Sequence, residues 1–294
     1  MRELLHTPWT WQAAALLLIA ASCSLPEVTF DQPAQDGGAG QPAGGAAGES
    51  SGGAAGQMQD GAACVSSSSY RDAVMSDGPI GYWRLGENFR DSSGHGQDLT
   101  VEGAAAAAAP GALACDADHA AGFSRNGWLT RSKTPQLEPK SAFSFELWMQ
   151  QHGSPVVYEK PIWYGDANGP PYGSWGFERW NTQTASTFSF FVNLNGTAPH
   201  VHSSAFMEQN RWYHVVGTYD GAKMRLYVDG QLDGELGAPE VNGGTIDYPD
   251  SYGFTIGACY GGCSLMSGVV DEVAIYDKAL SAERVAAHYA AASR

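Results

Sequence analysis

The feature that most constrains the fold is a series of short segments, between residues 70 and 294, in which apolar and polar residues alternate. Each segment is bounded by Gly, Pro, Asn or Asp, a pattern typical of β-strands separated by turns. In the segment AFSFELWMQ, alternation places four apolar side chains on one strand face, namely Phe143, Phe145, Leu147 and Met149. The segments STFSFFVNL and RWYHVVGTY follow the same rule. This part of the chain is therefore predicted to be β-rich.

One hairpin and two helices complete the predicted elements. Asp229 and Gly230 separate two alternating segments in MRLYVDGQLDGEL, and an Asp-Gly pair tolerates the positive φ angles of a tight turn. A short helix is predicted over SYRDAVMSD and a final one over LSAERVAAHYAAAS, where Ser281 is the expected N-cap. Many strands with so few helices predict a two-sheet sandwich in one domain.

The N-terminus has the character of an export signal. Arg2 precedes the apolar stretch WQAAALLLIAAS, which is too short to span a bilayer comfortably. The stretch ends in LIAASC, which resembles the lipobox of bacterial lipoproteins, although Ala20 stands where Leu is commoner. Residues 1–23 are therefore predicted to be a lipoprotein signal peptide ending at the lipid-accepting Cys23.

A linker is predicted over residues 24–63. From about Gln32 to Ala63 the residues are mainly Gly, Ala, Ser, Gln and Pro, which bury too little apolar surface to offset chain entropy. Such a disordered tether would hold a domain of residues 64–294 clear of the outer membrane or cell surface of a bacterium. The formal net charge of -15 repels nucleic acid, so none is expected as a partner.

Four cysteines follow Cys23, at Cys64, Cys115, Cys259 and Cys263. An even number in an exported chain predicts two disulfide bonds. Sequence alone permits three pairings, but the last two cysteines enclose the turn CYGGC, whose glycines let the chain bend. This favours Cys259–Cys263 and Cys64–Cys115. A zinc site is the alternative, but no CxxC or HxxxH spacing supports it.

Several motifs together resemble a known family. IGYWRLGE, DSSGHGQDLT, AFSFELWM, RWYHVVGTYDGAKMRLYVDGQLDG and SGVVDEVAIYDKALSAERVAAHYAA occur in this order, and the resemblance covers nearly all of residues 70–292. They resemble the laminin G-like domains of the concanavalin A-like jelly-roll superfamily. The resemblance implies an all-β jelly roll of two curved antiparallel sheets, each of six or seven strands. It does not imply one function, because this fold hosts lectins, adhesion modules and glycosidases.

No catalytic constellation is predicted. A glycosidase needs paired carboxylates on one face of a strand, and the nearest candidates are Glu146 and the neighbours Asp271 and Glu272. Adjacent strand residues face opposite sides, so Asp271 and Glu272 are not expected to act together. No GxSxG motif is present. The domain is therefore expected not to be an enzyme.

One structural Ca²⁺ ion is predicted. Asp91 opens the glycine-containing loop DSSGHGQD, and the resemblance implies that this loop lies near the strand of Asp271. Carboxylate and carbonyl oxygens are the ligands that Ca²⁺ prefers. Asp98 is a weaker third candidate. The alternatives are an Asx turn at Asp91 and a strand-end hydrogen bond at Asp271.

A ligand site is predicted in YEKPIWYGDANGPPYGSWGFERW, which is unusually rich in aromatic residues. Trp and Tyr rings stack on the apolar faces of sugars. The expected binding residues are Trp163, Tyr164, Tyr172, Trp175 and Trp180, with Tyr260 in the small cysteine loop. Nearby Asp166, Asn168 and Arg179 would bond hydroxyl groups, and His200 and His202 would share the same sheet face. The alternative is that part of this set fills the core, as Trp83, Trp148 and Trp212 are expected to do.

These observations predict a surface-anchored, non-catalytic binding module. Its expected partner is a polysaccharide or glycoconjugate, with the membrane engaged through the N-terminal lipid. The alternative is an adhesion or scaffold protein that binds another surface protein. An enzyme acting on glycans is the remaining possibility, which turnover abolished by changing Glu146 or Glu272 would support.

Overall fold

The computed structural model describes residues 68–292, except 105–106, 115, 117, 154–155, 157, 167–171, 182–185 and 249–250. The predicted signal peptide with Cys23, the predicted linker and the predicted Cys64–Cys115 disulfide lie outside the described residues. Neither helix in the described part of the chain is long and apolar enough to cross a membrane.

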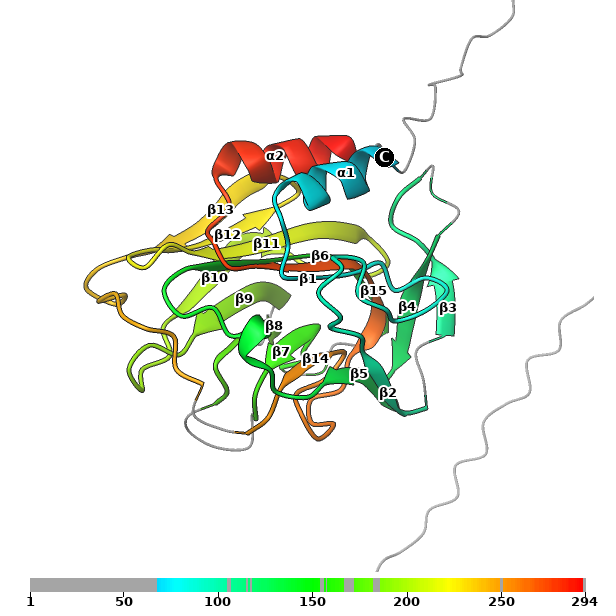
Figure 1. Cartoon of the computed structure of the whole chain (residues 1–294), viewed down its shortest axis with the longest axis horizontal. Helices are drawn as coiled ribbons and strands as arrows, with labels where there is room; N and C mark the ends of the chain where they lie inside the picture. Colours follow the sequence, from blue (N-terminus) through cyan, green and yellow to red (C-terminus); the bar gives the residue numbers. More distant parts are fainter. Residues whose placement is uncertain are drawn as a thin grey trace, which may run out of the picture. The chain divides into compact units, whose positions relative to one another are not determined.

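Two antiparallel sheets form a jelly-roll sandwich, as the alternating segments predict (Figure 1). Sheet A has eight strands, with β1 beside β15 and the others in the order β13-β12-β11-β6-β15-β4-β3. They are β1 (Gly81–Trp83), β3 (Ala107–Pro110), β4 (His119–Ser124), β6 (Phe143–Gln151), β11 (Trp212–Tyr219), β12 (Met224–Val228), β13 (Gln231–Leu236) and β15 (Ser267–Tyr276).

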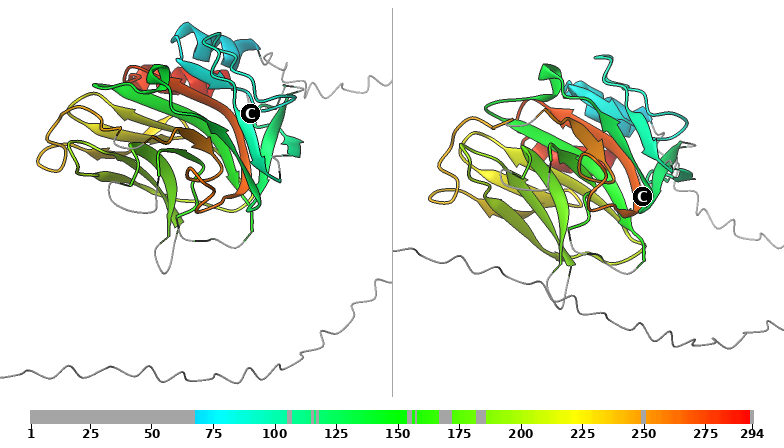
Figure 2. Two further views of the ribbon diagram at one scale, coloured as in Figure 1. Left: turned by 60° about the horizontal axis from the view of Figure 1, so that its bottom comes forward. Right: turned by 90° about the horizontal axis from the view of Figure 1, so that it is seen from below.

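Sheet B has seven strands in the order β10-β9-β8-β7-β14-β5-β2. They are β2 (Thr100–Gly103), β5 (Gly127–Arg131), β7 (Ile162–Tyr164), β8 (Trp175–Asn181), β9 (Ser186–Val192), β10 (His200–Phe206) and β14 (Phe254–Ile256). The view from below in Figure 2 brings this sheet to the front.

Sheet A has one strand more than the resemblance implies, because two short strands share one edge of β15. Residues 267–270 of β15 pair with β4, and residues 273–275 pair with β1. Strand β6 pairs along the opposite edge of β15. The long strand β15 therefore lies inside the sheet over its whole length.

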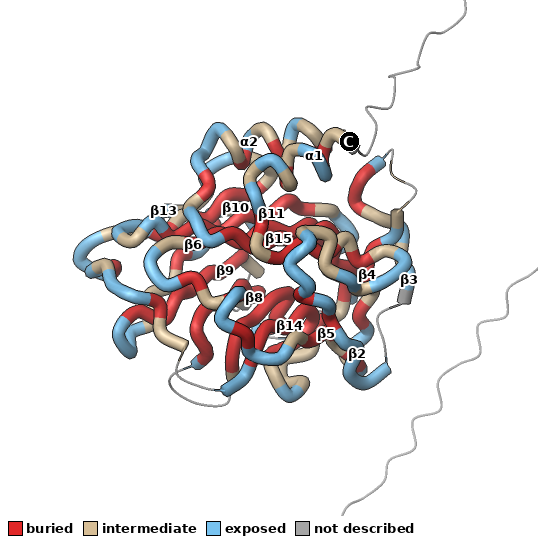
Figure 3. The backbone as a smooth tube through the Cα atoms, viewed as in Figure 1, coloured by how far each residue is buried: buried red, intermediate tan, exposed pale blue. Residues whose placement is uncertain are grey.

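The main core lies between the two sheets. The side chains that alternation places on one face of β6 all belong to it, namely Phe143, Phe145, Leu147 and Met149, as predicted. Figure 3 shows the strands of both sheets as mostly buried, with exposed residues concentrated in the loops. The expected core residue Trp83 lies in this layer, fully buried.

Two helices, α1 (Ser68–Ser76) and α2 (Ala282–Ala291), lie side by side on the outer face of sheet A (Figure 1). Between them and the sheet is a second apolar cluster that includes Tyr70, Trp148 and Val285, with Trp212 packed partly buried against it. Strand β6 is therefore buried on both faces. A short 3₁₀ helix, η1 (Pro135–Leu137), precedes β6.

The local signals in the sequence are confirmed. Asp229 and Gly230 both have positive φ angles, of 50° and 78°, in the turn between β12 and β13. The Ser281 hydroxyl accepts a hydrogen bond from the Arg284 amide at the start of α2. Cys259 and Cys263 form the predicted disulfide bond.

Candidate functional site

The outer face of sheet B, which points away from sheet A, carries the side chains that alternation keeps out of the core. In β7, Tyr164 enters the core and Trp163 faces outward. In β8, Phe177 enters the core, so Glu178 and Trp180 on either side of Arg179 face outward. These two strands thus present aromatic and charged groups on the same surface.

A hollow of about 360 Å³ opens on this face. Its walls come from β7, β8, β9 and β10 and from the segments before β7, before β8 and after the disulfide. The lining residues are Tyr158, Lys160, Trp163, Tyr172, Glu178, Trp180, Phe191, His200 and Ser264. Most of them are aromatic, and the hollow is therefore lined largely by ring faces and edges.

Trp163 and Phe191 form the buried part of the lining. Their ring centroids are 4.6 Å apart, and the disulfide-bonded Cys259 packs against them. Gly176 makes this arrangement possible, because a Cβ at position 176 would overlap the Trp163 ring. The small disulfide loop therefore supports the hollow from one side.

Tyr158, Tyr172 and Trp180 form the accessible part of the lining. The rings of Tyr158 and Trp180 meet edge to face with centroids 5.2 Å apart. Tyr172 is 51% exposed, so its ring is accessible to solvent. Accessible aromatic faces beside a recessed aromatic floor form a surface suited to a flat, partly apolar ligand.

A buried ion pair supplies the charge in the hollow. The ammonium group of Lys160 bonds the carboxylate of Glu178, and both residues are buried. The same ammonium lies 3.9 Å from the centroid of the Trp163 ring, a cation–π contact. Burial lowers the pKa of Lys160, while the neighbouring Glu178 favours its charged form.

Two histidines on β10 continue the aromatic surface. The His200 ring stacks against Phe191 with centroids 5.3 Å apart, and His202 lies 6.1 Å beyond His200. Both histidine rings contact Trp180. Burial, followed by the nearby His202 and Lys160, lowers the pKa of His200 to about 4, so this ring is neutral at pH 7.

The structure divides the predicted ligand residues into two groups. Trp163, Tyr172 and Trp180 line the hollow. Tyr164 and Trp175 do not, because both are fully buried in the core between the sheets. Their assignment as ligand contacts is wrong for a physical reason: they alternate with outward-facing neighbours on β7 and β8.

Three further predicted contacts, Tyr260, Arg179 and Asp166, do not line the hollow. Tyr260 is partly buried and packs against Tyr252, with ring centroids 4.9 Å apart, and it is not among the lining residues. Arg179 points to the interior, where its Nη1 donates to Glu159 Oε2 at 3.0 Å. Asp166 is not among the lining residues, and Asn168 lies outside the described residues.

Sequence reasoning missed the ion pair. The backbone N–H of Arg179 donates to the Glu159 carbonyl at 2.9 Å, which places the segment before β7 beside β8. The dipeptides Glu159-Lys160 and Glu178-Arg179 then lie side by side. Glu159 pairs with Arg179 on the inner side of the sheet, and Lys160 pairs with Glu178 on the outer side. The reversed charge order of these two dipeptides is the signal that could have identified the pair.

Asp91 and Asp271 already use their carboxylates for hydrogen bonds. Asp91 accepts backbone N–H groups from Tyr82, Ser93, His95 and Gln97, which closes the loop as an Asx-type turn. Burial would raise the pKa of Asp91, but these bonds and the Ser93 hydroxyl lower it. Asp271 accepts the backbone N–H groups of Ala112 and Glu272. Asp98 accepts the Asp91 amide. These bonds correspond to the alternatives to calcium, an Asx turn at Asp91 and a hydrogen bond at Asp271, and the shared Ca²⁺ site stays a prediction.

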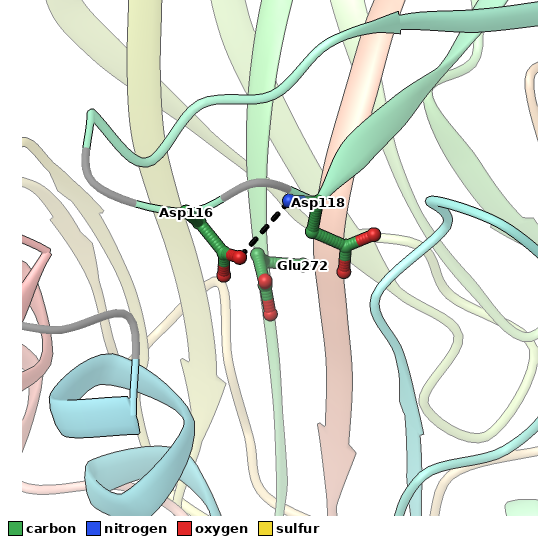
Figure 4. A group of neighbouring side chains, drawn as sticks. All are labelled: Asp116, Asp118 and Glu272. Atoms are coloured by element: carbon green, nitrogen blue, oxygen red, sulfur yellow. Dashed lines mark hydrogen bonds between the residues drawn. The ribbon is translucent and has the colours of Figure 1, made fainter.

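A different carboxylate trio lies nearby (Figure 4). Oxygen atoms of Asp116, Asp118 and Glu272 lie within 4.8 Å of one another. The guanidinium group of Arg84 bonds all three, with 3.1 Å between its Nε and Glu272 Oε1. Burial raises the pKa of Glu272 to about 7 against the opposing effect of Arg84. The protein thus supplies one positive charge, that of Arg84, to these three carboxylates.

The structure around Asp271 departs from the strict alternation that the sequence predicted for Asp271 and Glu272. Strand β15 carries a bulge between Asp271 and Ala274, and Glu272 has a φ angle of 50°. A bulge interrupts strict alternation. Glu272 accepts hydrogen bonds from Tyr82 and Arg84, and Asp271 accepts one from Ala112, so both carboxylates contact the part of the chain between residues 82 and 112. Both carboxylates are nevertheless buried, and neither lines the hollow.

Glu146 is also remote from the hollow. It lies fully buried beneath the helices, where it accepts hydrogen bonds from the Tyr70 and Tyr276 hydroxyls and is paired with His214 and His288. The two glutamates considered as catalytic candidates, Glu146 and Glu272, therefore hold structural elements together.

A laminin G-type family model, described as the concanavalin A-like lectin/glucanases superfamily, matches residues 123–286, more than half of the chain. The chain belongs to this superfamily. The match includes β6 to β15 and hence all the strands that border the hollow. A sequence search of curated proteins returns no match for this member of the superfamily.

Solved structures with the same fold include binding domains of larger proteins. Domain 4 of AbnA, a GH43 extracellular arabinanase from Geobacillus stearothermophilus solved with arabinotriose, has a TM-score of 0.54 and 16% identity; the match covers 71% of this chain and 96% of that chain. The binding domain of botulinum neurotoxin DC, solved with SialylT, has a TM-score of 0.53 and 16% identity, with 74% and 52% covered.

The same toxin domain has also been solved with a protein, rat synaptotagmin II. That structure has a TM-score of 0.51 and 16% identity, and the match covers 74% of this chain and 52% of the toxin domain. The chain thus spans about half the length of the toxin domains. At this level of identity the likeness shows the fold, and the ligands named belong to those proteins.

Proposed function

We propose that this member of the superfamily is a carbohydrate-binding module that holds a glycan in the hollow on sheet B. The observation that carries the proposal is the aromatic lining of about 360 Å³ around one buried, hydrogen-bonding ion pair. Sugar sites combine these two components, because a pyranose or furanose ring has apolar C–H faces and a rim of hydroxyl groups.

The lining residues have separate tasks in this proposal. Tyr172 and Trp180 are accessible and provide the stacking surface for a sugar ring. Lys160 and Glu178 provide a donor and an acceptor for hydroxyl groups at the recessed end of the hollow, and Ser264 adds a further hydroxyl. Trp163 and Phe191 exclude water from the floor, which strengthens each of these polar contacts.

Binding without catalysis is the activity that the lining supports. Glycosidases position two carboxyl groups on either side of the scissile bond, about 5 to 9.5 Å apart. Among the described residues that line the hollow, Glu178 is the single carboxylate, and it is bonded to Lys160. The outward positions that flank it on β8 are Gly176 and Trp180, so the strand supplies no second acid.

The arrangement of the domain suits display on a surface. Helix α1 begins at Ser68 on the outer face of sheet A, and the hollow opens on the outer face of sheet B. The chain therefore enters α1 on the face of the sandwich opposite to the hollow. The motif LIAASC and the Gly- and Ala-rich composition of residues 32–63 support the proposal that the predicted export signal, Cys23 and linker hold the module at a bacterial surface.

A glycan array probed with the purified protein tests the proposed function. We expect binding to at least one class of glycan. We expect Trp180→Ala to reduce that binding about tenfold, since loss of an aromatic stacking surface costs up to about 1.5 kcal/mol beyond the apolar area buried. Phe206→Ala is the matched control, because Phe206 is an exposed aromatic residue on β10 that does not line the hollow.

The array should be run with calcium and again with a chelator. Asp91 and Asp271 do not line the hollow, so we expect the same sugar binding under both conditions. A blank array with a folded protein would refute the proposal and favour the alternative of a protein partner, which pull-down from a bacterial surface fraction would then address.

A further inference from the structure

The hollow contains balanced charge. Lys160 is the one cationic side chain and Glu178 the one carboxylate among the described lining residues. They are bonded to each other, and both are more than nine-tenths buried. His200 is the remaining titratable base in the lining, and it packs as a neutral ring between Phe191 and His202. The lining therefore has no net charge near pH 7.

The ion pair retains unused hydrogen-bonding capacity. An ammonium group has three N–H donors, and the described residues accept one of them, through Glu178 Oε2. The other carboxylate oxygen, Oε1 of Glu178, accepts no hydrogen bond from the described part of the chain; the nearest imidazole nitrogen, Nδ1 of His200, is 3.9 Å away and bonds Ser189 instead. The pair thus presents donors and an acceptor side by side.

Hydroxyl groups match this combination. A hydroxyl donates one hydrogen bond and accepts others, so one hydroxyl can donate to Glu178 Oε1 while it or its neighbour accepts from Lys160 Nζ. A carboxylate only accepts. In the same position it would lie against Glu178 Oε1, where the buried surroundings strengthen the repulsion between like charges.

We propose that the hollow is specific for uncharged sugars, and that the Lys160–Glu178 pair determines this specificity by bonding hydroxyl groups and repelling carboxylates. The inference rests on the proposed function and names the class of glycan that it selects. A carboxylated sugar could accept from the free N–H donors of Lys160 only with its negative charge beside the buried Glu178 carboxylate, where like charges repel strongly. The net charge of -15 on the chain acts in the same direction at longer range.

Matched pairs of polysaccharides test this specificity with the full chain. β-Glucan, galactomannan and starch are each used as isolated and after oxidation of their primary hydroxyl groups to carboxylates. Polygalacturonate and its methyl ester form a fourth pair. Affinity electrophoresis measures retardation of the protein in gels that contain each polymer. We expect the wild-type protein to bind uncharged members at least tenfold more tightly than their carboxylated counterparts.

Two variants separate the local charge from the overall charge. Glu178→Gln keeps the shape and the acceptor oxygen but leaves Lys160 unbalanced, so we expect the preference for the uncharged member to fall about tenfold or more. Glu240→Gln removes the same unit of charge from an exposed residue outside the hollow, and we expect it to leave the preference unchanged. The wild-type comparison stands even if Glu178→Gln fails to fold.

The outcomes distinguish this inference from the proposed function. Equal or tighter binding of carboxylated polymers by the wild-type protein, lost in Trp180→Ala, would overturn the specificity and leave glycan binding in the hollow intact. A preference for uncharged polymers that Glu240→Gln alters as strongly as Glu178→Gln would overturn the role of the pair. Absence of binding to every polymer, or binding insensitive to Trp180→Ala, would overturn both proposals.

Discussion

Glu146 shows how single residues in this domain reconcile charge with burial. It lies in the middle of β6 with no exposed surface, between the sheet and the two helices. The hydroxyl of Tyr70 donates to it at 2.9 Å and that of Tyr276 at 2.8 Å, while His214 and His288 bond it from other sides. Burial would raise the pKa of Glu146, but His288 and His214 outweigh burial and lower it. The carboxylate is therefore ionised and fully solvated by protein groups.

Removal of this charge is expected to destabilise the fold. Glu146→Gln keeps the side-chain size but turns one acceptor oxygen into an NH₂ donor that faces other donors. Because one partner of a buried charged network is lost, we expect the free energy of unfolding to fall by about 3 to 5 kcal/mol. Urea unfolding monitored by circular dichroism measures the change.

The control for this variant is Glu240→Gln, an exposed position where we expect a change within about 0.5 kcal/mol. A loss below about 1 kcal/mol for Glu146→Gln would show that the network contributes little to stability.

The two helices depend on one imidazole for part of their attachment to sheet A. In α2, His288 Nδ1 is 2.9 Å from Glu146 Oε2, and its Nε2 is 2.9 Å from Asp77 Oδ2, directly after α1. Arg284 also bonds Asp77, at 2.7 Å. Burial would lower the pKa of His288, but Glu146 and Asp77 outweigh it and raise this pKa. The protonated ring thus connects both helices to β6.

This attachment is expected to weaken at high pH. A histidine whose pKa is raised by folding contributes its full stability below its unfolded pKa, about 6.5. That contribution is lost as the pH rises through the higher folded pKa. We therefore expect the difference in unfolding free energy between the wild type and His288→Gln to be largest near pH 6 and to shrink toward pH 9. Urea titrations of both proteins at each pH measure it, and a difference that grows with pH would refute the assignment.

The positions of the strands could be predicted from the sequence more completely than the directions in which their side chains point. Alternation identified the inward face of β6, and turn and helix signals identified the hairpin at Asp229 and the two helices, because all of these signals are local. It also implies that Trp163 and Tyr164, as neighbours on one strand, face opposite sides, and this rule would have excluded Tyr164 from the ligand site. The bulge at Glu272 has no comparable local signal, since it depends on how β15 pairs with β6.

The Lys160–Glu178 pair could be predicted from the sequence only in part. Both residues are in the segment that the sequence singled out for its aromatic rings, but they are 18 positions apart and meet only because the chain before β7 runs beside β8. Long-range pairing of this kind cannot be obtained from local alternation. It decides which charges lie in the hollow, and hence the proposed specificity.

At the scale of the whole molecule, the sandwich separates attachment from binding. The helices cover the outer face of sheet A, and α1 is the first described element of the chain. The hollow lies beyond both sheets, on the outer face of sheet B. The chain therefore enters the described part of the domain on the side opposite to the hollow.

This separation predicts that membrane attachment leaves binding unchanged. Expressed in a bacterium that processes lipoproteins, the wild-type protein should partition into the detergent phase on Triton X-114 extraction, whereas Cys23→Ser should stay in the aqueous phase. Vesicles that carry the wild-type protein should bind a polysaccharide identified on the array with an affinity within about twofold of that of soluble Cys23→Ser, because a twofold change corresponds to only about 0.4 kcal/mol.

Partition of both forms into the aqueous phase would refute lipidation at Cys23. Lipidation together with loss of binding on vesicles would instead show that membrane attachment obstructs the hollow, while leaving the glycan site itself intact.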